Sequence, residues 1–128
     1  MYNQEHQVTE KNILIVDDTE SNIDILVESL SDAYEVSVAM DGESALEIVA
    51  EEPPDLILLD IMMPDMDGYE VCEKLKSDNN TKDIPIIFLS GATDEGSKEK
   101  GLALGAIDYI TKPIDKNIVL SKLKEHLT

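Results

Sequence analysis

The sequence predicts an α/β fold in which helices cover both faces of a parallel sheet. Short aliphatic runs alternate five times with segments whose apolar residues recur at helical spacing. The runs are almost wholly aliphatic, which is typical of strands buried on both faces. With 128 residues, of which 42% are hydrophobic, the chain has room for one domain with an ordinary core. We therefore expect one α/β domain over residues 11–128.

The N-terminal part of the chain contains a polar segment, a strand and a helix. Residues 1–10 are polar and aperiodic, so we expect a flexible tail. Four aliphatic residues in a row within 12–16 predict a strand, which ends at the acidic pair Asp17-Asp18. Apolar residues then recur at the i, i+3, i+4, i+7 spacing of an amphipathic helix, at Ile23, Leu26, Val27 and Leu30.

The middle of the chain predicts two more strands separated by a helix. Alternating valines indicate a strand over 34–39, and Asp41-Gly42 then breaks the chain. The run 56–59 is too short for a helix and predicts the central strand, which ends at the carboxylate of Asp60. The helix between these two strands is indicated by the stripe Ala45, Leu46 and Val49.

The C-terminal half continues the same alternation. The turn-rich segment 63–68 leads into a helix marked by Gly68, Val71, Cys72 and Leu75. Residues 84–89 and 107–111 predict the fourth and fifth strands. A helix is expected between them over about 94–104, where three glycines lower the helix propensity. The last helix is indicated by Val119, Leu120, Leu123 and Leu127.

A parallel sheet brings the ends of these strands to one edge. Crossovers between parallel strands are right-handed, so the alternation predicts a doubly wound, flavodoxin-like three-layer sandwich of strand order 2-1-3-4-5. Strands 1 and 3 are neighbours where the winding reverses, so their three carboxylates are expected to meet there. The residues that follow strands 1, 3, 4 and 5 share this rim, and they are Asp17, Asp18, Asp60, Ser90 and Lys112.

Three carboxylates so close together predict a metal site. Like charges would raise one another's pKa strongly unless a cation lay between them. Because the set contains no His or Cys, it suits Mg²⁺, or else Mn²⁺, bound by one or two carboxylates and several waters. The metal, the ammonium of Lys112 and the hydroxyl of Ser90 could together hold a phosphoryl group. Asp60 would then be the nucleophile that forms an acyl phosphate.

Each of these residues taken alone also has a structural role that needs no chemistry. Asp17 or Asp18, taken alone, is as consistent with an N-cap of the following helix as with a metal site. Asp60, taken alone, could be an acidic loop residue with the same capping role. Ser90 alone is typical of a turn, and Lys112 of a solvated loop base. The joint placement favours a site, because helix capping does not predict a lysine at the same rim.

The composition limits the partners and the location. The chain carries 10 basic and 28 acidic residues, a net charge of −18, so direct binding to nucleic acid or to an anionic membrane is not expected. No apolar stretch approaches the ~20 residues of a membrane span, and residues 1–10 lack the apolar core of a signal peptide. We therefore expect a cytoplasmic protein. Cys72 is the single cysteine, which excludes an internal disulfide, and it is expected in the core.

Several motifs stand at the ends of the predicted strands, and they are Asp17-Asp18, Asp60, Met63-Pro64-Asp65-Met66-Asp67-Gly68, Ser90-Gly91-Ala92 and Tyr109-Ile110-Thr111-Lys112-Pro113. With these motifs the sequence resembles, from Lys11 to Leu127, the receiver domain of bacterial two-component response regulators, such as the chemotaxis regulators. The resemblance implies a signalling module that accepts a phosphoryl group on Asp60, in a Mg²⁺-dependent reaction, from a histidine kinase or a histidine phosphotransfer domain. It implies no other catalysis: the domain promotes only its own phosphorylation and dephosphorylation.

The resemblance also implies a role for each site residue. Asp18, Asp60 and the backbone carbonyl of Met62 would contact Mg²⁺ directly, and Asp17 mainly through water. Lys112 would pair with the phosphoryl group, and its peptide bond to the following proline is expected to be cis.

A conformational switch is implied as well. On phosphorylation Ser90 would turn its hydroxyl toward the phosphoryl group and Tyr109 would move inward. The movement would alter the face made by the helix near 94–104, strand 107–111 and the last helix. By the resemblance, Met62 and Ala92 occupy the positions that tune how fast water reaches the acyl phosphate. Neither can position a water through its side chain, so slow loss of the phosphoryl group is expected.

Two other functions share some of these features. A metal-dependent phosphohydrolase needs an acid–base carboxylate near its nucleophile, and none stands two residues after Asp60. A flavin-binding module would share the fold, but segment 17–20 is acidic where a phosphate cradle needs donors. The resemblance allows a target protein or an output domain, and a homodimer on activation. The sequence fits both a stand-alone regulator and a receiver within a longer protein.

Overall fold

The described part of the chain forms a parallel sheet with strand order β2-β1-β3-β4-β5, which confirms the predicted topology. The computed structural model describes residues 11–91 and 95–127, so the predicted tail lies outside the described residues. The strands are β1 (Asn12–Val16), β2 (Glu35–Ala39), β3 (Leu56–Asp60), β4 (Ile86–Ser90) and β5 (Asp108–Thr111). The helices are α1 (Glu20–Leu30), α2 (Gly42–Glu51), α3 (Gly68–Lys76), α4 (Glu95–Ala103) and α5 (Lys116–Leu127).

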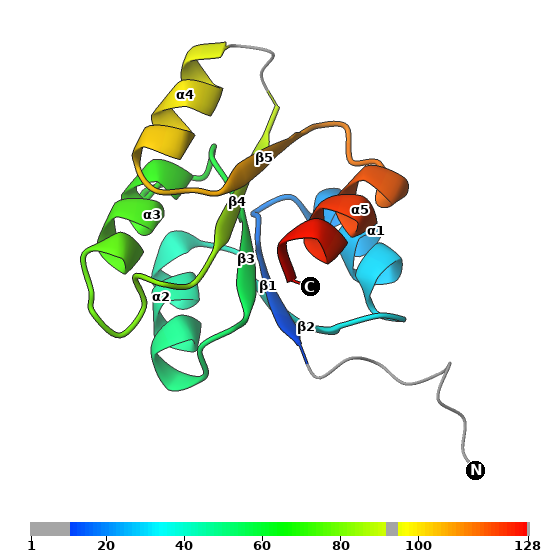
Figure 1. Ribbon diagram of the computed structural model, residues 1–128, viewed down its shortest axis with the longest axis horizontal. Coiled ribbons are helices and arrows are strands. Elements are labelled where there is room, and N and C mark those ends of the chain that lie inside the picture. Colours follow the sequence, from blue (N-terminus) through cyan, green and yellow to red (C-terminus); the bar gives the residue numbers. More distant parts are fainter. Residues whose placement is uncertain (1–10, 92–94, 128) are drawn as a thin grey trace.

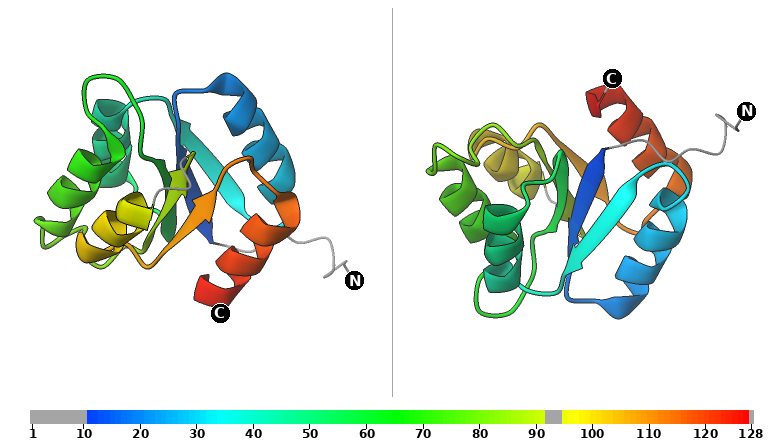
Figure 2. Two further views of the ribbon diagram at one scale, coloured as in Figure 1. Left: turned by 90° about the horizontal axis from the view of Figure 1, so that it is seen from above. Right: turned by 90° about the horizontal axis from the view of Figure 1, so that it is seen from below.

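Helices cover both faces of the sheet. Helices α1 and α5 lie on one face, and α2, α3 and α4 lie on the other (Figure 1). The two further views in Figure 2 show the same three layers. Side chains alternate along each strand, so every central strand contributes to two apolar clusters. For example, Leu58 packs into the cluster under α1 and α5, whereas Leu59 packs into the cluster under α2 and α3.

The starts of three predicted strands are corrected by one or two residues. The fourth strand begins at Ile86 rather than residue 84, because the Ile84 N–H bonds the Thr81 carbonyl in the preceding turn and Pro85 has no N–H. The second strand begins at Glu35, since the N–H of the preceding residue bonds the last turn of α1. The fifth strand begins at Asp108 instead of residue 107.

Helix α4 differs from the other helices in how it packs. It spans Glu95–Ala103, within the predicted range 94–104, and residue 94 lies outside the described residues. Among the α4 residues whose burial is described, Gly101 is the buried one, and an added Cβ there would lie 2.7 Å from the Phe88 ring. Gly105 has a φ of +112°, a conformation that glycine adopts without strain, and it follows the end of the helix. Two of the three glycines therefore have a structural role.

The described helices are too short or too polar to span a bilayer. Across residues 11–91 and 95–127, no helix has the length and apolar character that a membrane crossing needs.

Candidate functional site

Strand periodicity brings three charged side chains to one face at one end of the sheet. Asp17, Asp60 and Lys112 each stand two residues after an apolar residue of the α1/α5 cluster. Because side chains alternate with period two, all three continue that face, Asp60 as the last residue of β3 and the other two directly after β1 and β5. The apolar residues are Ile15, Leu58 and Ile110.

The three side chains meet, as predicted. Lys112 Nζ lies 2.9 Å from Asp60 Oδ1 and 3.6 Å from Asp17 Oδ2. Asp17 is 0% exposed and Asp60 is 2% exposed. Asp17 Oδ1 accepts a hydrogen bond from the Thr19 N–H at 2.9 Å, whereas Oδ2 has no hydrogen-bond partner among the described residues. Two buried carboxylates therefore share one ammonium group.

This environment raises the pKa of Asp60. Burial is the main cause, and the negative charge of Asp17 adds to it. The hydrogen bond and the charge of Lys112 act in the opposite direction, together with a hydrogen bond from the Met62 N–H. The carboxylate is thus held in a site that carries less positive than negative charge.

The donor set fits a hard divalent cation. One carboxylate oxygen from each of Asp17, Asp18 and Asp60 lies within 4.8 Å of the others. A bound cation with its waters would supply a partner for the buried Asp17 Oδ2, which has no hydrogen-bond partner within residues 11–91 and 95–127. Carboxylate oxygens without imidazole or thiolate are the ligands that Mg²⁺ prefers.

The capping alternative for the acidic pair is not what the structure shows. The N-cap of α1 is Thr19, and its side chain makes no capping hydrogen bond. Asp18 is exposed while Asp17 is buried, so the two neighbouring acids occupy different environments. Neither residue caps the helix.

Gly68 allows the loop after β3 to pack against the backbone of Asp60. A Cβ at this position would lie 2.2 Å from the Asp60 carbonyl oxygen. The Gly68 N–H donates to the Ile61 carbonyl at 2.8 Å, which closes the loop. Asp67 then caps α3 by accepting from the Glu70 N–H at 2.9 Å. The apolar pattern of the sequence marks Gly68 only as a helix position, because this close contact leaves no periodic signal.

Ser90 is buried at the end of β4, but on the other face of the sheet. It follows Phe88 by two residues and pairs with Thr111 in the ladder. Alternation therefore gives Ser90 the face of Phe88 and Tyr109. The Ser90 carbonyl accepts from the Lys112 N–H at 2.7 Å, so β4 is bonded directly to the residue that carries the ammonium group. The Lys112-Pro113 bond is cis, as expected.

The remaining predicted residues lie around this rim. The Met62 side chain is 76% exposed, although its N–H bonds the Asp60 carboxylate. Tyr109 is partly buried and packs against the cluster under α2 and α3. Ala92 lies outside the described residues.

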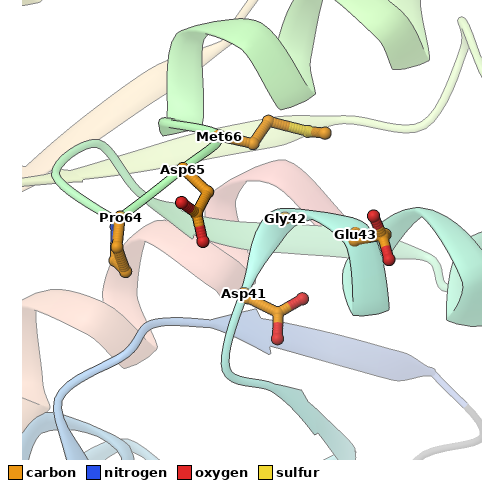
Figure 3. Close-up of a pocket in the computed structure, with 6 residues that line it drawn as sticks. All are labelled: Asp41, Gly42, Glu43, Pro64, Asp65 and Met66. Atoms are coloured by element: carbon orange, nitrogen blue, oxygen red, sulfur yellow. The ribbon is translucent and has the colours of Figure 1, made fainter.

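A pocket of about 210 Å³ lies between the β2–α2 turn and the loop after β3. Figure 3 shows the Asp65 carboxylate pointing across this space toward the turn that carries Asp41. None of the predicted site residues lines the pocket, so we do not identify it with the site. Its lining residues are Asp41, Gly42, Glu43, Pro64, Asp65 and Met66.

A second charged group was not predicted from the sequence. Asp108, Glu125 and His126 place donor atoms within 4.8 Å of one another. Lys122 Nζ lies 3.1 and 3.0 Å from the two carboxylate oxygens of Asp108, and His126 Nε2 lies 3.0 Å from Oδ2. The Asp108 charge is therefore already paired by protein groups. The partners are far apart in the sequence, so no local pattern connects them.

Comparison with known proteins gives a consistent result. Residues 13–124 match the response regulator receiver domain family. The response regulator PleD of Caulobacter vibrioides is 46% identical over 113 residues, which cover 88% of this chain and 25% of that protein. The curated relatives compared are longer, and the chain spans between 25% and 50% of their length.

Two solved structures show the same fold. The chemotaxis response regulator CheY4 of Vibrio cholerae has a TM-score of 0.86 and 32% identity, with 91% of this chain and 98% of that chain covered. The receiver domain of the sensor histidine kinase PA1611 from Pseudomonas aeruginosa has a TM-score of 0.83 and 28% identity, covering 91% and 97%. The latter structure contains a magnesium ion in its active-site cleft.

Proposed function

This chain belongs to the response regulator receiver domain family, and from that premise we propose that Asp60 is the residue that accepts the phosphoryl group. A receiver domain is a signalling phosphoacceptor of two-component systems. The observation that supports Asp60 is its burial at 2% exposure, 2.9 Å from Lys112 and beside the unsatisfied oxygen of Asp17. In a folded protein such a charge cluster is costly unless it binds something.

Phosphoryl transfer to Asp60 requires its ionised form. An Asp60 oxygen forms the new P–O bond while the P–N bond of a phosphohistidine donor breaks, and the donor imidazole takes up a proton. Lys112 opposes the rise in the pKa of Asp60 that burial causes, and so favours the nucleophilic form. We propose that its ammonium group, 2.9 Å from Asp60 Oδ1, binds a phosphoryl oxygen on the product.

Receiver domains bind Mg²⁺, and the oxygen donors described above fit that ion. We propose Asp18, Asp60 and the Met62 carbonyl as direct ligands, with Asp17 acting mainly through water. Bound Mg²⁺ supplies positive charge for the phosphoryl oxygens. Mn²⁺ is proposed as a substitute because it accepts the same donors.

The proposed switch connects Ser90 and Tyr109. Both side chains belong to the face of the sheet that α2, α3 and α4 cover. The Ser90 carbonyl is hydrogen-bonded to the Lys112 N–H. A turn of the Ser90 hydroxyl toward the phosphoryl group would free space on this face for the Tyr109 ring. The proposed output is a population shift of the surface made by α4, β5 and α5.

Receiver domains interact with histidine kinases and with output domains. We propose a histidine kinase or a histidine phosphotransfer domain as the phosphoryl donor of this chain, and residues 11–128 as the receiver domain. An attached output domain, a separate target and a homodimer on activation are all compatible with the relatives. No catalysis beyond its own phosphorylation and dephosphorylation is proposed, since Met62 stands where a phosphohydrolase would need a carboxylate.

The test uses acetyl phosphate and Mg²⁺ with intact-mass detection. Wild type should gain the mass of one phosphoryl group, and Asp60→Asn should not. The matched control is Asp65→Asn, which removes an exposed carboxylate from the same loop and should be phosphorylated like wild type. A phosphoryl gain in Asp60→Asn, or no gain in wild type, would refute the assignment.

A further inference from the structure

The ring of Tyr109 lies between two ammonium groups that come from different helices. Lys98 Nζ of α4 lies 4.7 Å from the ring centroid, and Lys122 Nζ of α5 lies 5.9 Å from it. Both distances fall within the roughly 6 Å range of cation–π attraction. A single β5 side chain is therefore contacted by the helices on both sides of it.

Lys122 is held in place by the residue before Tyr109. Its ammonium group donates to both oxygens of Asp108, at 3.1 and 3.0 Å. Asp108 Oδ1 also accepts from the Tyr109 N–H at 2.8 Å, and Oδ2 lies 3.0 Å from His126 Nε2. The cation near the ring is thus fixed to the same strand as the ring itself.

Lys98 belongs to a helix, α4, of which no described side chain is a member of the two apolar clusters. The residue that α4 packs on Phe88 is Gly101, and the neighbouring Leu102 is 39% exposed. A second lysine of α4, Lys100, lies 4.4 Å from the ring centroid of Tyr69. Two described lysines of α4 therefore lie over aromatic rings of β5 and α3.

We propose that Lys98 and Lys122 are positioning residues that hold the half-buried Tyr109 ring between α4 and α5. The inference rests on the proposed function, in which Tyr109 moves inward when Asp60 is phosphorylated. A ring that moves inward from its half-buried position would leave both ammonium groups, so each contact stabilises the arrangement seen here. An exposed cation–π contact changes such a population by about two- to fivefold. The position of the Tyr109 ring and the binding of a phosphoryl group at Asp60 are coupled, and such a coupling is reciprocal. Losing one Lys–ring contact should therefore tighten binding of the phosphoryl group by the same factor.

The test measures the affinity for beryllofluoride, which has been used to activate a related receiver domain. In the presence of Mg²⁺, Lys98→Gln should bind beryllofluoride about two- to fivefold more tightly than wild type. Lys98→Arg keeps a cation over the ring and should restore the wild-type affinity. Lys122→Gln should act in the same direction as Lys98→Gln.

Lys100→Gln is the matched control, because it removes one positive charge from the same helix but contacts Tyr69 instead of Tyr109. Its affinity should equal that of wild type. A second control places Lys98→Gln in a Tyr109→Leu background, where the effect of the substitution should disappear. Equal affinities of Lys98→Gln and Lys100→Gln, or an undiminished effect without the Tyr109 ring, would overturn the inference. A wild type that does not bind beryllofluoride, or an Asp60→Asn variant that binds it equally well, would instead refute the proposed function.

Discussion

Asp17 and Asp18 show how strongly the environment of a residue depends on one position in the sequence. Asp17 is fully buried and continues the row of β1 side chains that face α1 and α5, whereas Asp18 is exposed. Asp17 shares Lys112 with Asp60 and keeps one oxygen unsatisfied. Because a buried carboxylate oxygen without a hydrogen bond is costly, we expect the energy of Asp17 to depend strongly on a bound cation.

At the residue scale we predict slow loss of the phosphoryl group, because the thioether of Met62 cannot hold an attacking water by a strong hydrogen bond. Met62→Asn places a side-chain amide close to the carboxylate, because the N–H of this residue bonds Asp60. The amide can orient a water but cannot take its proton. We therefore expect dephosphorylation to be roughly tenfold faster, which is less than the usual gain from a general base. Phosphate release from purified phosphoprotein measures the rate.

The control for this prediction is Met40→Asn, which changes another exposed methionine, in the turn between β2 and α2, and should keep the wild-type rate. Wild-type phosphoprotein that decays within seconds, or a Met62→Asn variant that decays no faster, would contradict the prediction.

Among the elements, β5 and α5 are joined by charge as well as by apolar packing. Asp108 at the start of β5 is paired with Lys122 and His126 of α5. Burial alone would raise the pKa of Asp108, but hydrogen bonds from His126, the Tyr109 N–H and Lys122 outweigh it and lower the pKa. The ionised form of Asp108 is therefore more favourable in the folded chain than in the unfolded chain.

The lowered pKa gives a pH dependence with a definite sign. A carboxylate with a depressed folded-state pKa stabilises the fold above its unfolded pKa, near pH 4, and loses this contribution as the pH falls further. Asp108→Asn should lower Tm by a few degrees above about pH 4, and the difference from wild type should shrink below it. Thermal unfolding followed by circular dichroism at several pH values measures this difference.

Asp83→Asn is the control for that experiment, since it replaces an exposed aspartate of the α3–β4 connection. Its Tm difference from wild type should be small throughout. A constant Tm difference for Asp108→Asn across the acid range would show that the carboxylate charge is not what joins β5 to α5.

The charge of the whole molecule is unevenly distributed along the chain. Residues 12–73 contain no lysine or arginine, although they form β1 to β3 and supply Asp17, Asp18 and Asp60. The positive charge at the site comes from Lys112, which follows β5 at the other end of the sheet order. Phosphorylation chemistry at Asp60 therefore depends on the complete sheet, since its acids and its ammonium group lie in different halves of the chain.

At the scale of the whole molecule we predict that Mg²⁺ stabilises the fold. Saturating Mg²⁺ should raise the free energy of unfolding by about 1–3 kcal/mol, because only the folded chain assembles the three carboxylates. Asp17→Asn should raise Tm without Mg²⁺, since it relieves repulsion between buried carboxylates, and should lose most of the Mg²⁺ effect.

Thermal unfolding in EDTA and in MgCl₂ measures both effects. A chain with a net charge of −18 is also stabilised by general screening, so NaCl at equal ionic strength is the necessary control. Asp65→Asn should keep the full Mg²⁺ increment. An equal increment in NaCl, or an undiminished one in Asp17→Asn, would contradict a specific site.

Boundaries and side-chain partners are where sequence reasoning was weakest. The fourth strand was predicted to start at residue 84, but Pro85 and a turn bond at Ile84 move the start to Ile86. The acidic pair had a capping alternative that the sequence left open, and the structure gives the N-cap to Thr19. Both differences arise because hydrogen bonds of turns compete with the pattern of apolar residues.

The sequence by itself determined the α/β fold, the strand order and the residues that end each strand, because periodicity and chirality act along every short segment. Only the tertiary structure decided that Asp17 rather than Asp18 is buried beside Lys112, and that Tyr109 lies between Lys98 and Lys122. These contacts join segments far apart in the chain. They depend on how layers pack, and packing leaves no local pattern in the sequence.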